Sequence, residues 1–445
     1  MRDQLNPIFQ LLFHGAKRHW SNPMREALSQ IAGGKVDWFK WLSIARYYRI
    51  SPLLYFNLSR NDLLENLPLN IRQELKKDFL ETHSLNLAQY HELNRLLKLF
   101  QDAGINCLVL KGAALAISLY PDIGLRPFGD IDLLLHDKDI ARAEELLGGS
   151  YQRQTPDNLS ALAQSCYFHY HYQRVAPPKL SIELHWRLFS PTTPLQLDLS
   201  GFWEQKQTVE AFGWSFSVPS RECLFLHLCL HFCGHYFLSW RDLWDIDWFL
   251  ASDEPPLRDL ERIKIPYTEL SLRGSLIAEA ISDARAEIAS LPSVARNDIN
   301  GIIEISKSLN WDRLIEIARH HQIEYRLYYP LYWAQQLLDA QPPPDVMERL
   351  QPSAGKKRIF QNIMTSHGGI LKEPANRKKD LRAVIDILLL NPGQILSFYR
   401  RLCYPGIAWL TIFPDNPAED GRLRIFLRGV RLLFYSLWRL IRAGW

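Results

Sequence analysis

The chain has 445 residues, enough for two or three domains, and its 47% hydrophobic and 22% charged content excludes an intrinsically disordered protein. The formal net charge of +4 excludes a generally polyanion-binding protein, and six cysteines in this length do not predict a disulfide framework. Neither the first 20 residues nor any apolar run predicts a signal peptide or a membrane span, so we expect a globular protein of the reducing cytoplasm.

The first 104 residues are expected to be helical, because apolar residues recur at helical spacing in segments such as 85–103. A glycine then precedes a short apolar strand at 105–110. A helix is predicted at 112–120, where a proline follows, and a second strand at 127–135.

A further helix is predicted at 138–147, closed by two glycines. Strands at 167–175 and 180–188 flank an Ala-Pro-Pro-Lys turn and predict a hairpin. Almost everything after residue 219 has a helical pattern.

Two aspartates, Asp130 and Asp132, stand two positions apart in a predicted strand, so their side chains share one face. Ile131 and Leu133 point the other way, toward a core. Two neighbouring carboxylates repel each other unless a cation lies between them. Mg²⁺ suits such a site because it binds one or two carboxylates together with substrate phosphates. The pattern therefore predicts metal-dependent phosphoryl or nucleotidyl transfer.

A third carboxylate, Glu183, shares the polar face of a predicted strand with Ser181 and His185. An acidic residue on an apolar strand is costly unless it is paired or metal-bound. If this strand lies beside the one with Asp130 and Asp132, the three carboxylates can hold two Mg²⁺ ions with a triphosphate. A structural ion pair of Glu183, or a hydrogen bond between His185 and Glu183, remains the simpler alternative.

Phosphate-binding candidates lie next to these strands. Lys111 can reach a phosphate as a point charge, and Gly112 lets backbone N–H groups approach a phosphate at a helix start. Arg126 offers a planar fork for a triphosphate. A surface lysine and a loop salt bridge remain the alternatives.

Residues 227–235, HLCLHFCGH, combine three histidines with two cysteines, as in some zinc sites. On the expected helix the histidines share one face and the cysteines lie roughly opposite, so we predict no stoichiometric zinc. His227 and His231 are expected to line or brace a cleft. Asp245 and Asp247 are expected to hold these histidines or to bind an acceptor, with a plain polar helix face as the alternative.

A short pattern, W-x5-I-A-R-x3-I, occurs at residues 38–50 and again at 311–323. It suggests equivalent helices on either side of the predicted catalytic unit. Two unrelated amphipathic helices remain an alternative.

Taken in order, these elements resemble the nucleotidyltransferase superfamily typified by DNA polymerase β. More narrowly, the chain resembles a bacterial family known as nucleotidyltransferase family proteins. The resemblance extends to the helical flank ARYYRISPLLY. The matching segments are 45–55, 110–135, 182–188, 227–231 and 241–247. It implies an α+β fold, with a small mixed sheet and its helices embedded in a largely α-helical protein.

The resemblance implies Mg²⁺-dependent transfer of an NMP group from an NTP, expected to be ATP, to an acceptor hydroxyl or phosphate, with release of pyrophosphate. The catalytic and metal-binding residues it implies are Asp130, Asp132 and Glu183. The nucleotide-binding residues it implies are Lys111, Gly112, Ala113, Arg126, Gly129 and His185. The cleft or acceptor residues are His227, His231 and Asp245.

The acceptor is expected to be a small molecule, saccharide or peptide rather than a nucleic acid. Two alternatives stay open: a non-catalytic nucleotide-binding module, and a toxin-like enzyme that modifies tRNA.

Residues 421–445 contain six arginines and no acidic residue, and five of the arginines fall on one narrow stripe of a helix. We expect this helix to dock on the protein. Binding to the inner membrane face is the alternative. The expected regions are an N-terminal helical region (1–83), a catalytic unit (84–190), a helical domain completing the cleft (191–350) and a C-terminal helical region (351–445).

Overall fold

The computed structural model describes residues 7–155, 167–189, 195, 197–235, 237, 239–251 and 308–366. The Arg-rich segment 421–445, with its predicted docking or membrane contact, lies outside these residues. Within the described ranges, no helix combines the length and the apolar character that crossing a membrane requires.

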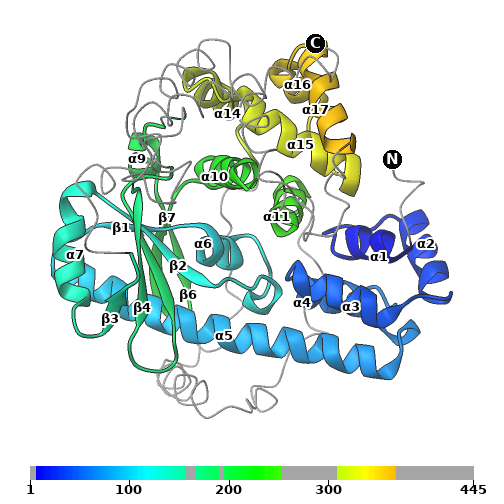
Figure 1. Cartoon of the computed structure of the whole chain (residues 1–445), viewed down its shortest axis with the longest axis horizontal. Coiled ribbons are helices and arrows are strands. Elements are labelled where there is room, and N and C mark those ends of the chain that lie inside the picture. The colour runs from blue at the N-terminus through cyan, green and yellow to red at the C-terminus, as the bar shows by residue number, and fades with distance from the viewer. Residues whose placement is uncertain are drawn as a thin grey trace, which may run out of the picture.

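The N-terminal part is helical, as predicted. Its elements are α1 (Pro7–Gly15), α2 (Asn22–Ala32), α3 (Trp38–Tyr47), α4 (Ser51–Arg60), η2 (Leu64–Asn66) and α5 (Leu69–Asp102). The 34-residue α5 runs from these first helices to the sheet (Figure 1). Along it, Phe79, Leu93 and Phe100 are buried in the main core.

Two polar contacts fasten other segments to α5. Near its start, Glu74 and Asp78 form ion pairs with Arg46 of α3. Further along, Asn86 and Gln89 donate hydrogen bonds to backbone carbonyls of the loop that precedes the second strand. The helix thus contacts both the N-terminal region and that loop.

A five-stranded mixed sheet follows α5. Its strands are β1 (Cys107–Val109), β2 (Asp130–Leu135), β3 (Tyr151–Arg153), β4 (His169–Arg174) and β5 (Ser181–His185). The order is β1-β2-β5-β4-β3, with β2 parallel to β5 and the other pairs antiparallel. The predicted hairpin is the antiparallel pair β4 and β5. The short elements between the strands are α6 (Lys111–Ser118), η3 (Ile123–Leu125), η4 (Asp137–Asp139) and α7 (Ile140–Leu147).

The sheet has one apolar and one polar face near its centre. Ile131, Leu133, Ile182 and Leu184 are fully buried in the main core. The alternate residues of β2 and β5 therefore point to the opposite face, as period-2 alternation requires. The α+β prediction is confirmed.

A second hairpin, β6 (Gln207–Ala211) and β7 (Trp214–Val218), follows α9 (Ser200–Glu204). We expected residues 191–350 to be helical, so this hairpin was not predicted. Phe212 and Gly213 form its turn with positive φ of 57° and 74°, the backbone of a type I′ turn.

The later described helices pack on one another, and α10 packs on α6. They are α10 (Arg221–Gly234), α11 (Trp240–Leu250), α14 (Trp311–His320), α15 (Glu324–Leu338), α16 (Pro344–Leu350) and α17 (Ala354–Ser366). In Figure 1, α10 and α11 lie between α6 and α15, and contacts join α10 to α6 and α11 to α15. Trp244 and Trp248 donate hydrogen bonds to the carbonyls of Phe13 and Ala16, which joins α11 to the N-terminal helices.

The repeated sequence pattern forms the same local structure twice. Each copy is a helix, α3 or α14, followed by a turn and a second helix. The turn residues Arg49 and Gln322 have φ of 56° and 55°. The next residue, Ile50 or Ile323, donates a backbone hydrogen bond to the alanine five positions earlier, at 2.9 and 2.7 Å. The structure confirms two equivalent helix–turn–helix units.

Candidate active site

The predicted carboxylates converge on the polar face of the sheet. In the parallel pair of β2 and β5, Asp132 lies opposite Glu183 and Asp130 lies opposite Ser181. This register brings two carboxylates from strands 51 positions apart onto one face, because residues opposite each other in a sheet point the same way. The predicted meeting of the two strands is confirmed.

Lys111 lies at the centre of this group. Its Nζ is 2.6 Å from Asp132 Oδ1, 3.2 Å from Glu183 Oε2 and 3.4 Å from His185 Nε2. Burial alone would lower the pKa of Lys111, but the two carboxylates more than reverse this and raise it above its usual value. We expected Lys111 to reach a phosphate. In this structure its ammonium group instead pairs with Asp132 and Glu183 and offsets part of their charge.

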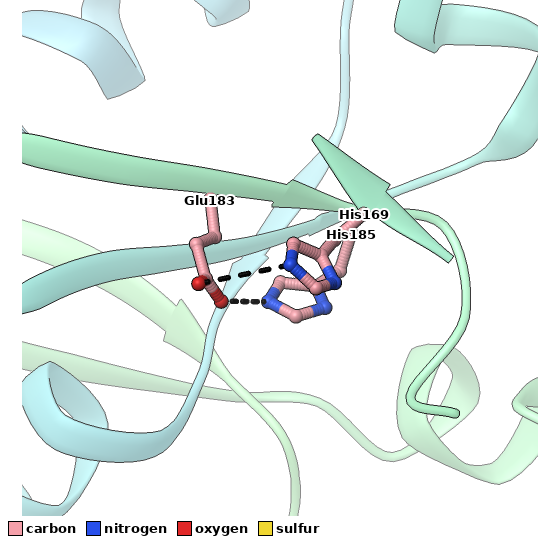
Figure 2. A group of neighbouring side chains, drawn as sticks. All are labelled: His169, Glu183 and His185. Carbon is pink, nitrogen blue, oxygen red and sulfur yellow. Dashed lines mark hydrogen bonds and ion pairs between the residues drawn. The ribbon is translucent and has the colours of Figure 1, made fainter. Parts of the chain in front are cut away.

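Two histidines border Glu183 (Figure 2). His185 Nε2 is 3.0 Å from Glu183 Oε2 and 3.0 Å from Asp132 Oδ1. His169 Nε2 lies 3.7 Å from the other carboxylate oxygen, Oε1. Burial, and then the charge of His185, lower the pKa of His169 to about 4, so its ring is neutral near pH 7. The His169 ring can therefore offer a nitrogen lone pair.

These donors fit a divalent cation. Neighbouring ligands of an octahedral ion with bonds of 2.0–2.1 Å lie about 3 Å apart. The ring nitrogen of His185 is 3.0 Å from one oxygen of Asp132 and one of Glu183. His169, Glu183 and His185 form a second compatible group, with ligand atoms within 4.8 Å of one another. Imidazole nitrogen extends the suitable metals from Mg²⁺ to Mn²⁺ and other transition ions.

Asp130 has a different environment. Among the described residues its carboxylate makes no hydrogen bond or ion pair. Its pKa is raised, first by burial and then by repulsion from Asp132 and Glu183. The pKa of Glu183, in contrast, is lowered, because hydrogen bonding to His185 and the charge of Lys111 outweigh its burial. An added cation would relieve the repulsion on Asp130.

A cleft of about 260 Å³ opens beside these carboxylates. Its lining includes nine of the predicted site residues: Lys111, Gly112, Arg126, Gly129, Asp130, Asp132, Glu183, His227 and His231. His185 is not part of the lining but contacts the carboxylates of Asp132 and Glu183. Ala113 and Asp245 do not line the cleft.

Gly112 and Ala113 open α6, where a phosphate was predicted. A Cβ added to Gly112 would stand 2.4 Å from Phe128 Cβ, so only glycine fits between the helix and this residue. Ala113 is fully buried, and its carbonyl accepts a hydrogen bond from the Tyr90 hydroxyl. Gly112 thus borders the cleft, whereas the side chain of Ala113 belongs to the core.

The Arg126 fork faces a protein carboxylate. Its Nε and Nη2 donate hydrogen bonds to Asp245 at 2.7–3.1 Å, and the Tyr120 hydroxyl donates a further hydrogen bond to the same carboxylate. Nη1 of Arg126 has no partner among the described residues. The expectation that Asp245 holds the histidines is wrong, because its position on α11 faces Arg126.

Asp242, one turn earlier on α11, holds the histidine instead. Its Oδ2 lies 2.8 Å from His231 Nδ1. Burial would raise the pKa of Asp242, but His231 lowers it to about 2. The helical prediction for 227–235 is confirmed: His231 and His227 line the cleft, while Cys229 and Cys233 are fully buried in the core. The prediction about zinc content stays a prediction.

The profile of a family described as uncharacterised nucleotidyltransferases matches residues 34–276, more than half of the chain. The chain belongs to this family.

No curated protein matches the chain. Among solved structures, the chain is similar to an antigenic nucleotidyltransferase-like protein from Paracoccidioides brasiliensis. That match has 16% identity and a TM-score of 0.28, and covers 50% of this chain and 94% of the other.

In this member of the uncharacterised nucleotidyltransferase family, several cleft residues escaped the sequence analysis. The missed lining residues are Arg49, His235, Arg241 and Asp242. The missed histidines of β4 are His169 and His171, which lie opposite His185 and Glu183. The alternation His-Tyr-His-Tyr in a predicted hairpin strand was the signal that could have placed both histidines beside Glu183.

Proposed function

We propose that this protein is a divalent-metal-dependent nucleotidyltransferase. It transfers an NMP group from an NTP, expected to be ATP, to the hydroxyl or phosphate of an acceptor. One observation supports this above the others: the register of β2 and β5 sets Asp132 beside Glu183 at the cleft, in a chain of the nucleotidyltransferase family.

In the proposed reaction an acceptor oxygen forms a bond to the α-phosphorus of the nucleotide. The bond from that phosphorus to the oxygen bridging to the β-phosphate breaks, and pyrophosphate leaves with the electron pair. The acceptor proton passes to a carboxylate of the cleft. Asp130 is better placed for this step than Glu183, because no described residue hydrogen-bonds its carboxylate.

Asp130, Asp132 and Glu183, with the ring nitrogen of His185, would hold the metal, and two ions are the expected number. When bound, the metal supplies positive charge to the reacting phosphate. Lys111 adds a cation at the same place, and Nη1 of Arg126, which has no partner among the described residues, adds a donor for phosphate oxygens.

The test is label transfer. Purified protein is incubated with Mg²⁺ or Mn²⁺, each α-³²P-labelled NTP in turn, and small-molecule, saccharide, peptide and tRNA fractions of a cell extract. Wild-type protein should label one fraction, which mass spectrometry then identifies. Asp132→Asn should give no label, while Asp137→Asn, on the exposed η4, should act as wild type. Equal labelling by Asp132→Asn would refute the proposal.

One observation favours the non-catalytic alternative. The Lys111 ammonium already pairs with both Asp132 and Glu183, so the fold can hold these carboxylates together without a metal. A nucleotide-binding module would bind NTP in equilibrium dialysis yet label no fraction with any metal. Labelling confined to the tRNA fraction would instead support the hypothesis of a toxin-like enzyme that modifies tRNA.

A further inference from the structure

Three guanidinium groups line the cleft, and they come from three separate parts of the chain. Arg49 lies between α3 and α4, Arg126 lies in the loop between η3 and β2, and Arg241 lies in the first turn of α11. Arg241 Nη1 donates a hydrogen bond to the carbonyl of Pro127, next to Arg126. The guanidinium nitrogens of Arg49 lie 3.6 and 3.8 Å from the position of a Cβ on Gly129.

Two of these groups have buried N–H donors with no acceptor. Among the described residues, Arg126 Nη1 and Arg241 Nε have no hydrogen-bond partner. Arg126 is only 3% exposed, so water reaches it poorly. A buried donor without a partner costs about 1–3 kcal/mol. A ligand with several acceptor oxygens in the cleft would remove this cost.

Arg49 shows a second anomaly. Its φ of 56° lies in the left-handed region, where a residue other than glycine is disfavoured by roughly 1–2 kcal/mol. Its side chain forms no hydrogen bond or ion pair with the described residues. Arg46, three positions earlier, is paired with Glu74 and Asp78. Arg49 therefore places at the cleft a guanidinium that no described residue pairs, despite a backbone that favours glycine.

Positive charge accumulates on this side of the cleft. Burial, and then repulsion from Arg126, lower the pKa of Arg241 to about 10. Arg49 contributes to the same repulsion. Asp242 and Asp245 act in the opposite sense but are already bonded to His231 and Arg126. The three arginines together therefore favour the binding of an anion.

We propose that Arg49, Arg126 and Arg241 form a subsite for the β- and γ-phosphates of the nucleotide. The geometry leads from the carboxylates to this subsite: Arg126 Nη1 lies 3.2 Å from the Cβ position of Gly112, beside Lys111 at the start of α6. A planar guanidinium matches the oxygens of a phosphate with paired hydrogen bonds. This inference rests on the proposed function for its ligand, and it makes the N-terminal helical region part of the nucleotide site.

The experiment measures binding rather than turnover. Isothermal titration calorimetry of the full chain uses tripolyphosphate, ATP and AMP as probes, each with and without Mg²⁺. Arg49→Ala should weaken tripolyphosphate and ATP by about tenfold or more, the loss expected for one charge-assisted contact, and should change AMP binding by less than about twofold. Arg49→Lys, which keeps the charge but loses the fork, should lie between.

The matched control is Lys40→Ala, which removes one exposed positive charge from α3 away from the cleft. It should bind all three probes as wild type does. Because Arg49 is exposed, its variants should fold, and circular dichroism verifies this.

Three results would overturn the subsite: tripolyphosphate that does not bind wild type, tripolyphosphate binding unchanged in Arg49→Ala, or an equal loss for AMP. If the arginines held a phosphorylated acceptor instead, Arg49→Ala would bind ATP and tripolyphosphate as wild type does. If tripolyphosphate binding depends on Arg49 but no fraction gains label, the subsite stands and the transferase proposal fails.

Discussion

The two sides of the cleft are assembled differently. The carboxylate side, Asp130, Asp132 and Glu183, comes from two adjacent strands whose register sets the spacing. The arginine side, Arg49, Arg126 and Arg241, comes from the turn between α3 and α4, a loop and helix α11, which only the tertiary fold brings together. The spacing of the carboxylates is thus set by local strand geometry, whereas the arginines meet only when the whole fold has formed.

The largest expected effect separates catalysis from binding. Asp132→Asn should reduce kcat at least about 10³-fold, roughly 4 kcal/mol of lost transition-state stabilisation, with a small change in KM. Arg49→Ala should mainly raise KM for the nucleotide. Steady-state kinetics with the labelled acceptor decides this. If both variants changed kcat alone, the division between the two sides would be wrong.

Gly112 joins the two sides, since it lies between Lys111 and the loop of Arg126. Gly112→Ala should destabilise the protein by roughly 1–3 kcal/mol, because the added methyl group meets Phe128 Cβ and neither can rotate away. Urea denaturation measures this. Gly201→Ala in α9, where an added Cβ has nothing within 4 Å, is the matched control and should not be destabilised. Equal stability of the two variants would show that the contact at Gly112 relaxes freely.

His227 and His231 of α10 line the cleft, and the burial of His227 predicts a pH effect. Burial lowers the pKa of His227 well below 6.5, so the unfolded chain binds a proton that the folded chain does not. The stabilising contribution is complete above about pH 6.5 and declines as the pH falls, by at most about 1.4 kcal/mol per pH unit. Denaturation between pH 7.5 and 5 should show a smaller slope for His227→Leu than for wild type. An identical slope would mean that His227 titrates normally.

The smallest effect compares the two repeated turns. Arg49→Gly and Gln322→Gly should each stabilise the protein by roughly 0.5–1 kcal/mol, since glycine accepts the left-handed backbone. Only Arg49→Gly should weaken tripolyphosphate binding, because Gln322 does not line the cleft. Thermal denaturation and calorimetry check both. Loss of binding in both variants would contradict a specific role for Arg49.

The carboxylate side was predictable from the sequence because two positions on a strand fix a shared face. Asp130, Asp132 and Glu183 needed only the pairing of two predicted strands. His169 was missed because the polar face of the first hairpin strand was not followed across to Glu183. The hairpin β6–β7 was missed although Trp-Ser-Phe-Ser-Val alternates with period 2.

The arginine side could not be predicted in the same way. Arg49 is 77 positions from Arg126 and 192 from Arg241 in the chain, and no local pattern states that they meet. Helical phase also decided which aspartate of α11 contacts α10: Asp242 does so, whereas Asp245 faces Arg126. That choice depends on how α11 is rotated against its neighbours, which follows from packing of its tryptophans.

The contacts of α5 fix a distance across this cleft. Asp78 of this helix forms an ion pair with Arg46, three residues before Arg49, and Asn86 further along donates a hydrogen bond to the carbonyl of Arg126. A continuous α-helix is stiff along its axis. The distance between Arg49 and Arg126 is therefore set by a helix that contacts no ligand. A kink in α5 between these two contacts would change the distance between Arg49 and Arg126, and with it the length of phosphate chain that the two arginines can bind. The register of β2 and β5, which positions the carboxylates, would stay the same.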